Sequence, residues 1–190
     1  MWQIELEKEI LKEVISDWDA FLLSQEIYWQ LNLSNKQISP ADRRVRISAG
    51  RILISYFVLE HLDGNDQEAI LSSFLALKNK WLANWQKKVS DELPVRIRQW
   101  NQFVNDLRTD SDFSQPQMNN QLQLRLMIDL LMNESDEYTR VKFLPLIENL
   151  DARYKHLTVK NGFVWGSELS EIFPKNKYWY LYQKTAKTGG

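Results

Sequence analysis

Apolar residues in the first part of the chain recur three and four positions apart, which is the pattern of helices that each bury one face. Residues 4–33 follow this spacing and are predicted to be helical. Within them, Ser16 followed by Asp19 has the spacing of a helix cap, so a second helix starting there stays open. Ser34 to Gln37 is polar and is predicted to form a loop.

A second helix is predicted over residues 39–62. Ser39 and Pro40 suit the N-cap and the first helical position, and Asp42 suits the positive end of the helix dipole. Apolar residues then occur on most sides of the helix up to Leu62, which indicates a central helix.

Helical spacing continues from Asn65 to Leu107, with Pro94 inside the series. A proline in a helix interior costs about 3 kcal/mol. This segment is therefore either one kinked helix or two helices, and we favour two, the second starting near Ser90. Further helices are predicted over residues 121–132 and 137–154.

The pattern changes after residue 156. Asn161-Gly162 lies between β-branched and aromatic residues, which predicts a β-hairpin over residues 157–165. A short helix is predicted from Ser167 to Phe173. The alternating aromatics from Tyr178 to Tyr182 predict a strand that pairs with the hairpin in a small three-stranded sheet.

These elements predict a mainly α fold, a bundle of about five to seven helices with a small C-terminal hairpin or three-stranded sheet. The expected organisation is a helical bundle over residues 1–155, a small α+β subdomain over 156–183 packed on that bundle, and a frayed tail over 184–190.

Composition narrows the class of protein. A chain of 190 residues buries enough surface to fold without disulfides or metals, and it contains no cysteine. Its acidic, amphipathic start differs from a secretory signal, and no stretch approaches 18 uncharged apolar residues. We expect a cytoplasmic protein without a membrane partner, and the oligomeric state stays open.

Charge is unevenly distributed, with a net −4 over residues 1–38 and +5 over residues 138–190. The densest basic group is expected on the helix over residues 39–62, where it is a candidate phosphate-binding site. Its members are Arg43, Arg44, Arg46 and Arg51. The alternative is that these arginines pair with the acidic N-terminal helix, because a guanidinium satisfies a carboxylate through two hydrogen bonds.

Candidate catalytic groups are sparse. His61 is expected to cap a helix C-terminus, and His156 is surrounded by positive charge with no carboxylate at short spacing to orient it. The pairs Glu134/Glu137 and Glu168/Glu171 are better explained as solvated charge at helix ends. The segment starting at Asp110 lacks the glycine and glutamate of a calcium loop. We therefore expect no metal site and no cofactor, and we favour a non-enzymatic protein while an enzyme stays open.

The C-terminal region combines aromatic and basic residues. If residues 178–182 form a strand, Tyr178, Tyr180 and Tyr182 share one face and expose their hydroxyl groups, while Trp179 and the neighbouring apolar side chains dock on the bundle. The candidate partner-binding residues are these three tyrosines with Lys175, Lys177, Arg153 and Lys155.

Three functions follow from these observations. The first is a helical binding or scaffold protein that contacts a protein partner through the C-terminal aromatics. The second is a nucleic-acid-binding protein that uses Arg43, Arg44 and Arg46 or the basic C-terminal end. The third is a helical metal-dependent phosphohydrolase whose carboxylates converge only in the fold.

Overall fold

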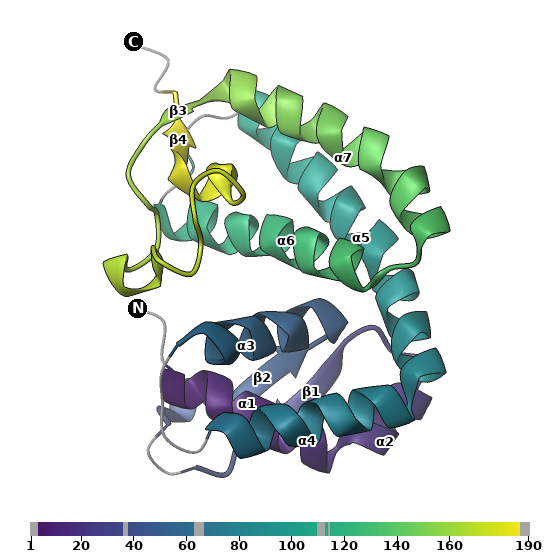
Figure 1. The fold of residues 1–190 in the computed structure, drawn as a ribbon. Helices are drawn as coiled ribbons and strands as arrows, with labels where there is room; N and C mark the ends of the chain where they lie inside the picture. Colours follow the sequence, from purple (N-terminus) through teal and green to yellow (C-terminus); the bar gives the residue numbers. More distant parts are fainter. Residues whose placement is uncertain (1–3, 36–37, 63–66, 110–112, 114, 187–190) are drawn as a thin grey trace. The chain divides into compact units, whose positions relative to one another are not determined.

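The predicted mainly α fold with small β elements is confirmed. The computed structural model describes residues 4–35, 38–62, 67–109, 113 and 115–186 (Figure 1). The α-helices are α1 (Ile4–Ser16), α2 (Trp18–Leu23), α3 (Ala49–His61), α4 (Gln67–Lys80), α5 (Leu82–Thr109), α6 (Gln115–Glu134) and α7 (Glu137–Leu157). Among the described helices, none is both long enough and apolar enough to cross a bilayer.

The chain divides into two compact units, which we call the N-terminal unit (residues 3–92) and the C-terminal unit (residues 93–190). The sequence suggested a boundary near residue 155, whereas the contacts place it between Glu92 and Leu93, within α5. The segment after residue 156 belongs to the same unit as α6 and α7.

In the N-terminal unit, α1, α3 and α4 pack against one another. Trp18 of α2 stacks on Trp85 of α5 with 5.5 Å between ring centroids, and Phe74 of α4 meets Trp18 edge-on, also at 5.5 Å. Fully burying side chains of this size contributes roughly 1.5–3 kcal/mol each. This aromatic cluster joins α2 to α4 and α5, which come much later in the sequence.

The N-terminal unit also contains a two-stranded antiparallel sheet, β1 (Trp29–Asn32) with β2 (Arg44–Ile47). The helices predicted over residues 4–33 and 39–62 are therefore wrong in part. The first ends at Ser16, next to the break that the sequence left open. The second begins only at Ala49, where Ser48 is the N-cap and accepts from the Arg51 amide at 3.3 Å. Ser39 and Pro40 instead begin a 3₁₀ turn, η1 (Pro40–Asp42).

The expected helix break near Ser90 is also wrong, because α5 is continuous through Pro94. Buried residues on both sides of the proline, including Leu93 and Ile97, keep the helical spacing. Their packing offsets the cost of the lost backbone hydrogen bond. Pro94 nevertheless lies one residue beyond the boundary between the two units.

In the C-terminal unit, β3 (Thr158–Lys160) follows α7 directly and pairs with β4 (Gln183–Thr185) in antiparallel register. The predicted hairpin around Asn161-Gly162 is not formed. The Asn161 amide donates instead to the Tyr182 carbonyl at 2.8 Å, and the Val164 amide to the Leu181 carbonyl at 3.0 Å. The chain after β3 thus continues along the C-terminal segment instead of folding back on itself.

The predicted short helix from Ser167 is present as a 3₁₀ turn, η2 (Ser167–Leu169). The segment predicted as a strand is a second 3₁₀ element, η3 (Trp179–Tyr182). Of the expected frayed tail, Lys184 and Thr185 belong to β4, and residues 187–190 lie outside the described part of the chain.

Candidate functional site

The expected row of exposed tyrosines is wrong. Tyr178 and Tyr180 are 2% and 0% exposed, and only Tyr182 keeps partial exposure. The reason is the local geometry, since a strand alternates faces every residue whereas a 3₁₀ helix repeats every three residues. Burial of Tyr178 raises its pKa to about 12. The hydroxyl groups expected on the surface therefore lie mostly inside the unit.

Tyr180 belongs to a buried ionic network that holds the C-terminal segment against α6 and α7. Arg125 donates to both carboxylate oxygens of Asp151, from Nε at 2.8 Å and from Nη2 at 2.7 Å. Arg125 Nη1 donates to Asp129 Oδ1 at 2.5 Å, and the Tyr180 hydroxyl donates to Asp129 Oδ2 at 2.7 Å. Burial, with the charge of Asp129, holds the pKa of Tyr180 well above its ordinary value. Tyr180 is thus a structural residue.

The period of three places Trp179 and Tyr182 on the same side of η3, and both remain half-exposed. Each carries a lysine ammonium over its ring. Lys155 Nζ lies 4.1 Å from the Trp179 ring centroid, and Lys175 Nζ lies 5.5 Å from that of Tyr182. The accessible aromatics of η3 are therefore Trp179 and Tyr182, and both are paired with cations.

A hollow of about 580 Å³, here called the Trp179 hollow, opens beside the Trp179 ring. Its lining comes from α7, β3, the loop before η3, η3 itself and β4. The lining residues are Lys155, Thr158, Lys160, Lys175, Asn176, Trp179 and Gln183. All three lysines are exposed, and no Asp or Glu lines the hollow. Such a surface suits an anionic group next to a flat apolar one.

The two remaining candidates near the C-terminus lie elsewhere. Arg153 donates from Nη1 to Asn101 Oδ1 at 3.3 Å and from Nη2 to Asn105 Oδ1, so it joins α7 to α5. Lys177 Nζ lies 5.2 Å from the ring centroid of Tyr178 and is exposed. Neither residue lines the Trp179 hollow. Of the basic residues predicted to bind a partner, the structure brings Lys155 and Lys175 together there.

The four arginines of the N-terminal unit separate into two kinds. Arg51 is held by Glu7 of α1, from Nη1 at 2.7 Å and from Nη2 at 2.9 Å, and also by Ser55 at 2.8 Å. For Arg51 the alternative reading, pairing with the acidic first helix, is therefore confirmed. Arg43 is half-buried and donates from Nε to the Ile38 carbonyl at 3.2 Å.

Arg44 and Arg46, in contrast, are exposed on β2, and neither forms an ion pair with any described residue. The Arg46 guanidinium lies over the Tyr28 ring, 4.2 Å from its centroid. The expectation that the four arginines share one helix is wrong, because Arg43 follows η1, Arg44 and Arg46 lie on β2, and Arg51 lies on α3. Two exposed guanidinium groups remain on a strand.

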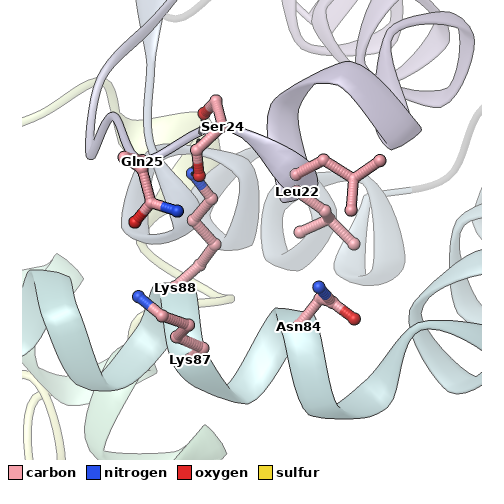
Figure 2. Close-up of a pocket in the computed structure, with 7 residues that line it drawn as sticks. Leu22, Ser24, Gln25, Asn84, Lys87 and Lys88 are labelled. Atoms are coloured by element: carbon pink, nitrogen blue, oxygen red, sulfur yellow. Dashed lines mark hydrogen bonds between the residues drawn. The ribbon is translucent and has the colours of Figure 1, made fainter.

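A smaller pocket of about 210 Å³ in the N-terminal unit is lined by residues of α2, the loop after it and α5 (Figure 2). Figure 2 shows Lys88 reaching from α5 to the end of α2. Its ammonium donates to the Ser24 carbonyl at 3.0 Å, to Ser24 Oγ at 2.9 Å and to the Glu26 carbonyl at 2.7 Å.

Burial, followed by the charge of Lys87, lowers the pKa of Lys88. A lysine of lowered pKa beside a pocket suggests a nucleophile. Here, however, the ammonium donates to three oxygen atoms of Ser24 and Glu26, just after α2, and these hydrogen bonds favour the charged form. Lys88 is therefore a structural clamp between α5 and the loop after α2.

The remaining candidates do not converge. His61 ends α3, with Nδ1 2.9 Å from the Phe57 carbonyl, as expected of a C-terminal capping residue. Within the described residues, no group of three or more His, Cys, Asp or Glu side chains is arranged to hold a metal ion. The segment starting at Asp110, which only partly resembles a calcium loop in sequence, lies largely outside the described residues.

Comparisons with known proteins provide no assignment. Searches of protein families, of curated proteins and of solved structures found no match to this chain. The function therefore has to be argued from the two surfaces described above, the Trp179 hollow and the exposed side of the β1–β2 sheet.

The sequence missed Trp179 as a surface residue and Glu92 as a buried one. Glu92 accepts from the Ser48 hydroxyl at 2.6 Å and from the Gly50 amide at 2.9 Å, at the N-terminus of α3. The available signal for Glu92 was its position on the apolar face of α5, beside Leu93 and three residues after Val89. A charged residue on an apolar face indicates a buried polar contact.

Proposed function

We propose that this chain is a non-enzymatic binding protein that holds an acidic segment of a protein partner in the Trp179 hollow. The observation that carries the proposal is the lining of this hollow, three exposed lysines around a half-exposed tryptophan without a carboxylate. A cytoplasmic location belongs to the same proposal.

Charge supports an acidic ligand. Residues 153–184 contain six Lys or Arg and two Glu, a net charge of +4. The two glutamates, Glu168 and Glu171, do not line the hollow. Positive potential in a concave surface raises the local concentration of anionic groups and speeds their association. The strength of binding is therefore expected to depend on salt.

The tryptophan supports a protein ligand. Trp, Tyr and Arg supply most of the energetic anchors of protein interfaces, and Trp179 is a partly exposed tryptophan that lines the hollow. Lys155, already positioned over that ring, loses less rotamer freedom on binding than an unrestrained lysine. An acidic segment containing an aromatic residue satisfies both features of the hollow.

The proposal is tested with a fluorescein-labelled peptide of twelve residues, made of Asp and Glu with one central Phe, by fluorescence anisotropy. The wild-type chain is expected to bind at 50 mM NaCl and to lose affinity at 200 mM NaCl. Lys155→Glu, which reverses a charge in the hollow, is expected to weaken binding at least tenfold.

Lys142→Glu is the matched control, because Lys142 is also exposed on α7 but does not line the hollow. It is expected to change the affinity less than twofold. Equal losses in the two variants, or no binding of the wild-type chain, would contradict the proposal. Equal binding of a control peptide in which lysine replaces every Asp and Glu would contradict the assignment of an acidic partner.

The phosphohydrolase alternative stays untested. Glu134 ends α6 and Glu137 begins α7, while Glu168 lies in η2. Among the described residues, no three His, Cys, Asp or Glu side chains lie together in a group that could hold a metal ion. We therefore give the binding function priority.

A further inference from the structure

The β1–β2 sheet of the N-terminal unit has one polar, exposed face. Leu31 and Ile47 are buried on its inner side, whereas the side chains between them alternate outward. The register pairs Gln30 with Arg46 and Asn32 with Arg44. All four of these outward residues are exposed. They form the set that we call the ribbon face: Gln30, Asn32, Arg44 and Arg46.

The chemical composition of the ribbon face points to base edges and phosphates. Arg forms two hydrogen bonds with guanine, and Asn and Gln do so with adenine, in the DNA major groove. Asn32 and the two arginines present their polar groups to solvent. Gln30 Nε2 donates to the carbonyls of Leu31 and Val45, at 3.0 and 3.1 Å, so Gln30 offers only its side-chain oxygen as an acceptor, and the two-bond contact with adenine falls to Asn32.

The spacing on the ribbon face also fits a nucleic acid. Outward residues two positions apart on a strand are separated by about 6.8 Å. Successive nucleotides of one DNA strand rise by about 3.4 Å, so this separation equals two steps along the duplex. A two-stranded ribbon is one of the two protein elements that the major groove, about 12 Å wide, admits.

The two arginines are available for such contacts. Neither forms an ion pair with a described residue, in contrast to Arg51, which Glu7 holds through both guanidinium nitrogens. Stacking on Tyr28 restricts the Arg46 guanidinium without using its hydrogen-bond donors. The cost of ordering this side chain on binding is correspondingly lower.

We propose that the ribbon face docks into the major groove of double-stranded DNA. A protein partner is less suited to it, because the four residues include no apolar anchor of the kind that interfaces need at their centre. An RNA duplex is also less suited, since its major groove is deep and narrow. This site is independent of the Trp179 hollow, and the two proposals fail separately.

The proposed DNA binding depends on the charges of the ribbon face, because the N-terminal unit as a whole is not basic. Residues 3–92 contain eleven Lys or Arg and fourteen Asp or Glu, a net charge of −3. With two phosphate-neutralising arginines, log K is expected to fall with log salt at a slope of about −1.8. Many distributed phosphate contacts would give a much steeper slope.

The test measures fluorescence anisotropy of the full chain with a labelled mixed-sequence 20-base-pair DNA duplex. The wild-type chain is expected to bind with a dissociation constant of roughly 1–100 µM at 50 mM NaCl. The double variant Arg44→Gln/Arg46→Gln is expected to weaken binding at least tenfold. Its circular dichroism and urea unfolding are expected to match wild type, because both side chains are exposed.

The control is Arg98→Gln/Arg108→Gln, which removes the same charge from exposed positions of α5. It is expected to change the affinity less than twofold. An equal loss in both double variants, absence of wild-type binding up to 100 µM, or equal affinity for an RNA duplex of the same sequence would overturn the proposal. A loss on Arg44→Gln/Arg46→Gln with acidic-peptide binding unchanged would support it and separate it from the Trp179 hollow.

Discussion

Each unit of the chain has an arginine that pairs with a carboxylate from another helix, but the two arginines differ in burial and surroundings. In the N-terminal unit, Arg51 joins α3 to Glu7 of α1, and Ser55 donates its hydroxyl to the same carboxylate at 2.7 Å. In the C-terminal unit, Arg125 is shared by Asp151 and Asp129, and the Tyr180 ring lies 4.9 Å from its guanidinium carbon.

The difference shows which charges are available for binding. Arg51, which is partly buried, and Arg125, which is buried, each pair with an acid from another helix, and these ion pairs stabilise the fold. Lys155 on Trp179 and Arg46 on Tyr28 each have an aromatic ring beside them and no ion pair with a described acid, and both are exposed. The proposed binding surface of each unit includes a base of this second kind.

The largest effect is expected from Arg125→Leu. This substitution leaves Asp151 and Asp129 without their cation in a buried setting, so we expect a loss of about 3–5 kcal/mol in the free energy of unfolding. Urea unfolding followed by circular dichroism measures it. Arg98→Leu, at an exposed position, is the control and is expected to cost less than about 0.5 kcal/mol. A loss below 1 kcal/mol for Arg125→Leu would show that the network is not what holds the C-terminal unit.

Glu92→Ala is expected to have a smaller effect, in the N-terminal unit. It leaves the buried Ser48 hydroxyl and the Gly50 amide without the carboxylate that accepts from them, at a cost of about 1–3 kcal/mol. The neighbouring Asp91→Ala removes only an exposed ion pair with Lys87 and is expected to cost at most about 1 kcal/mol. Similar losses in the two variants would contradict the buried role of Glu92.

Alkaline pH is expected to weaken the C-terminal unit gradually. The pKa of Tyr178 is raised from 10.0 to about 12, and burial raises the pKa of Tyr154 and Tyr180 further. A raised folded-state pKa means that the folded chain holds its proton more tightly than the unfolded chain. Stability is therefore complete below pH 10 and declines as the pH rises toward 12. Urea unfolding between pH 8 and 11 measures this, and no decline above pH 10 would count against three buried tyrosines.

The smallest effect is expected at Asp136, which caps α7 by accepting from the Thr139 amide at 2.7 Å. This hydrogen bond lowers the pKa of Asp136 from its ordinary value of 3.8. A lowered folded-state pKa gives stability that is present above pH 3.8 and is lost as the pH falls through the folded value. Asp136→Ala should therefore be slightly less stable than wild type at pH 7, and the difference should shrink as the pH falls below 3.8. A difference that does not shrink would contradict a role for the ionised cap.

The sequence predicted the helices whose spacing was regular over several turns, such as the one that became α7. It also offered the pairing of Arg51 with the acidic first helix as an alternative. It failed where a short segment satisfied two patterns at once. The four residues of β2 fit a helix that begins at Pro40, and only their pairing with β1, twelve or more residues earlier, selects the strand.

The candidate site was predicted in part for a related reason. Lys155 and Lys175 were chosen because they lie among aromatics in the sequence. The Trp179 hollow, however, needs residues from α7, β3, η3 and β4 to converge, which depends on tertiary pairing. The alternation from Tyr178 to Tyr182 favoured a strand. In the structure this segment contains a 3₁₀ turn, in which the Tyr180 hydroxyl donates a hydrogen bond to Asp129.

One pair of variants tests most directly the claim that η3 contributes a buried tyrosine to the fold and an accessible tryptophan to the surface. Urea unfolding of Tyr180→Ala and Trp179→Ala compares two adjacent aromatic residues in the same chain. We expect Tyr180→Ala to lose about 3–5 kcal/mol, as for a fully buried aromatic, and Trp179→Ala to lose less than half as much. The opposite order would contradict the account, because it would place Trp179 in the core and Tyr180 at the surface.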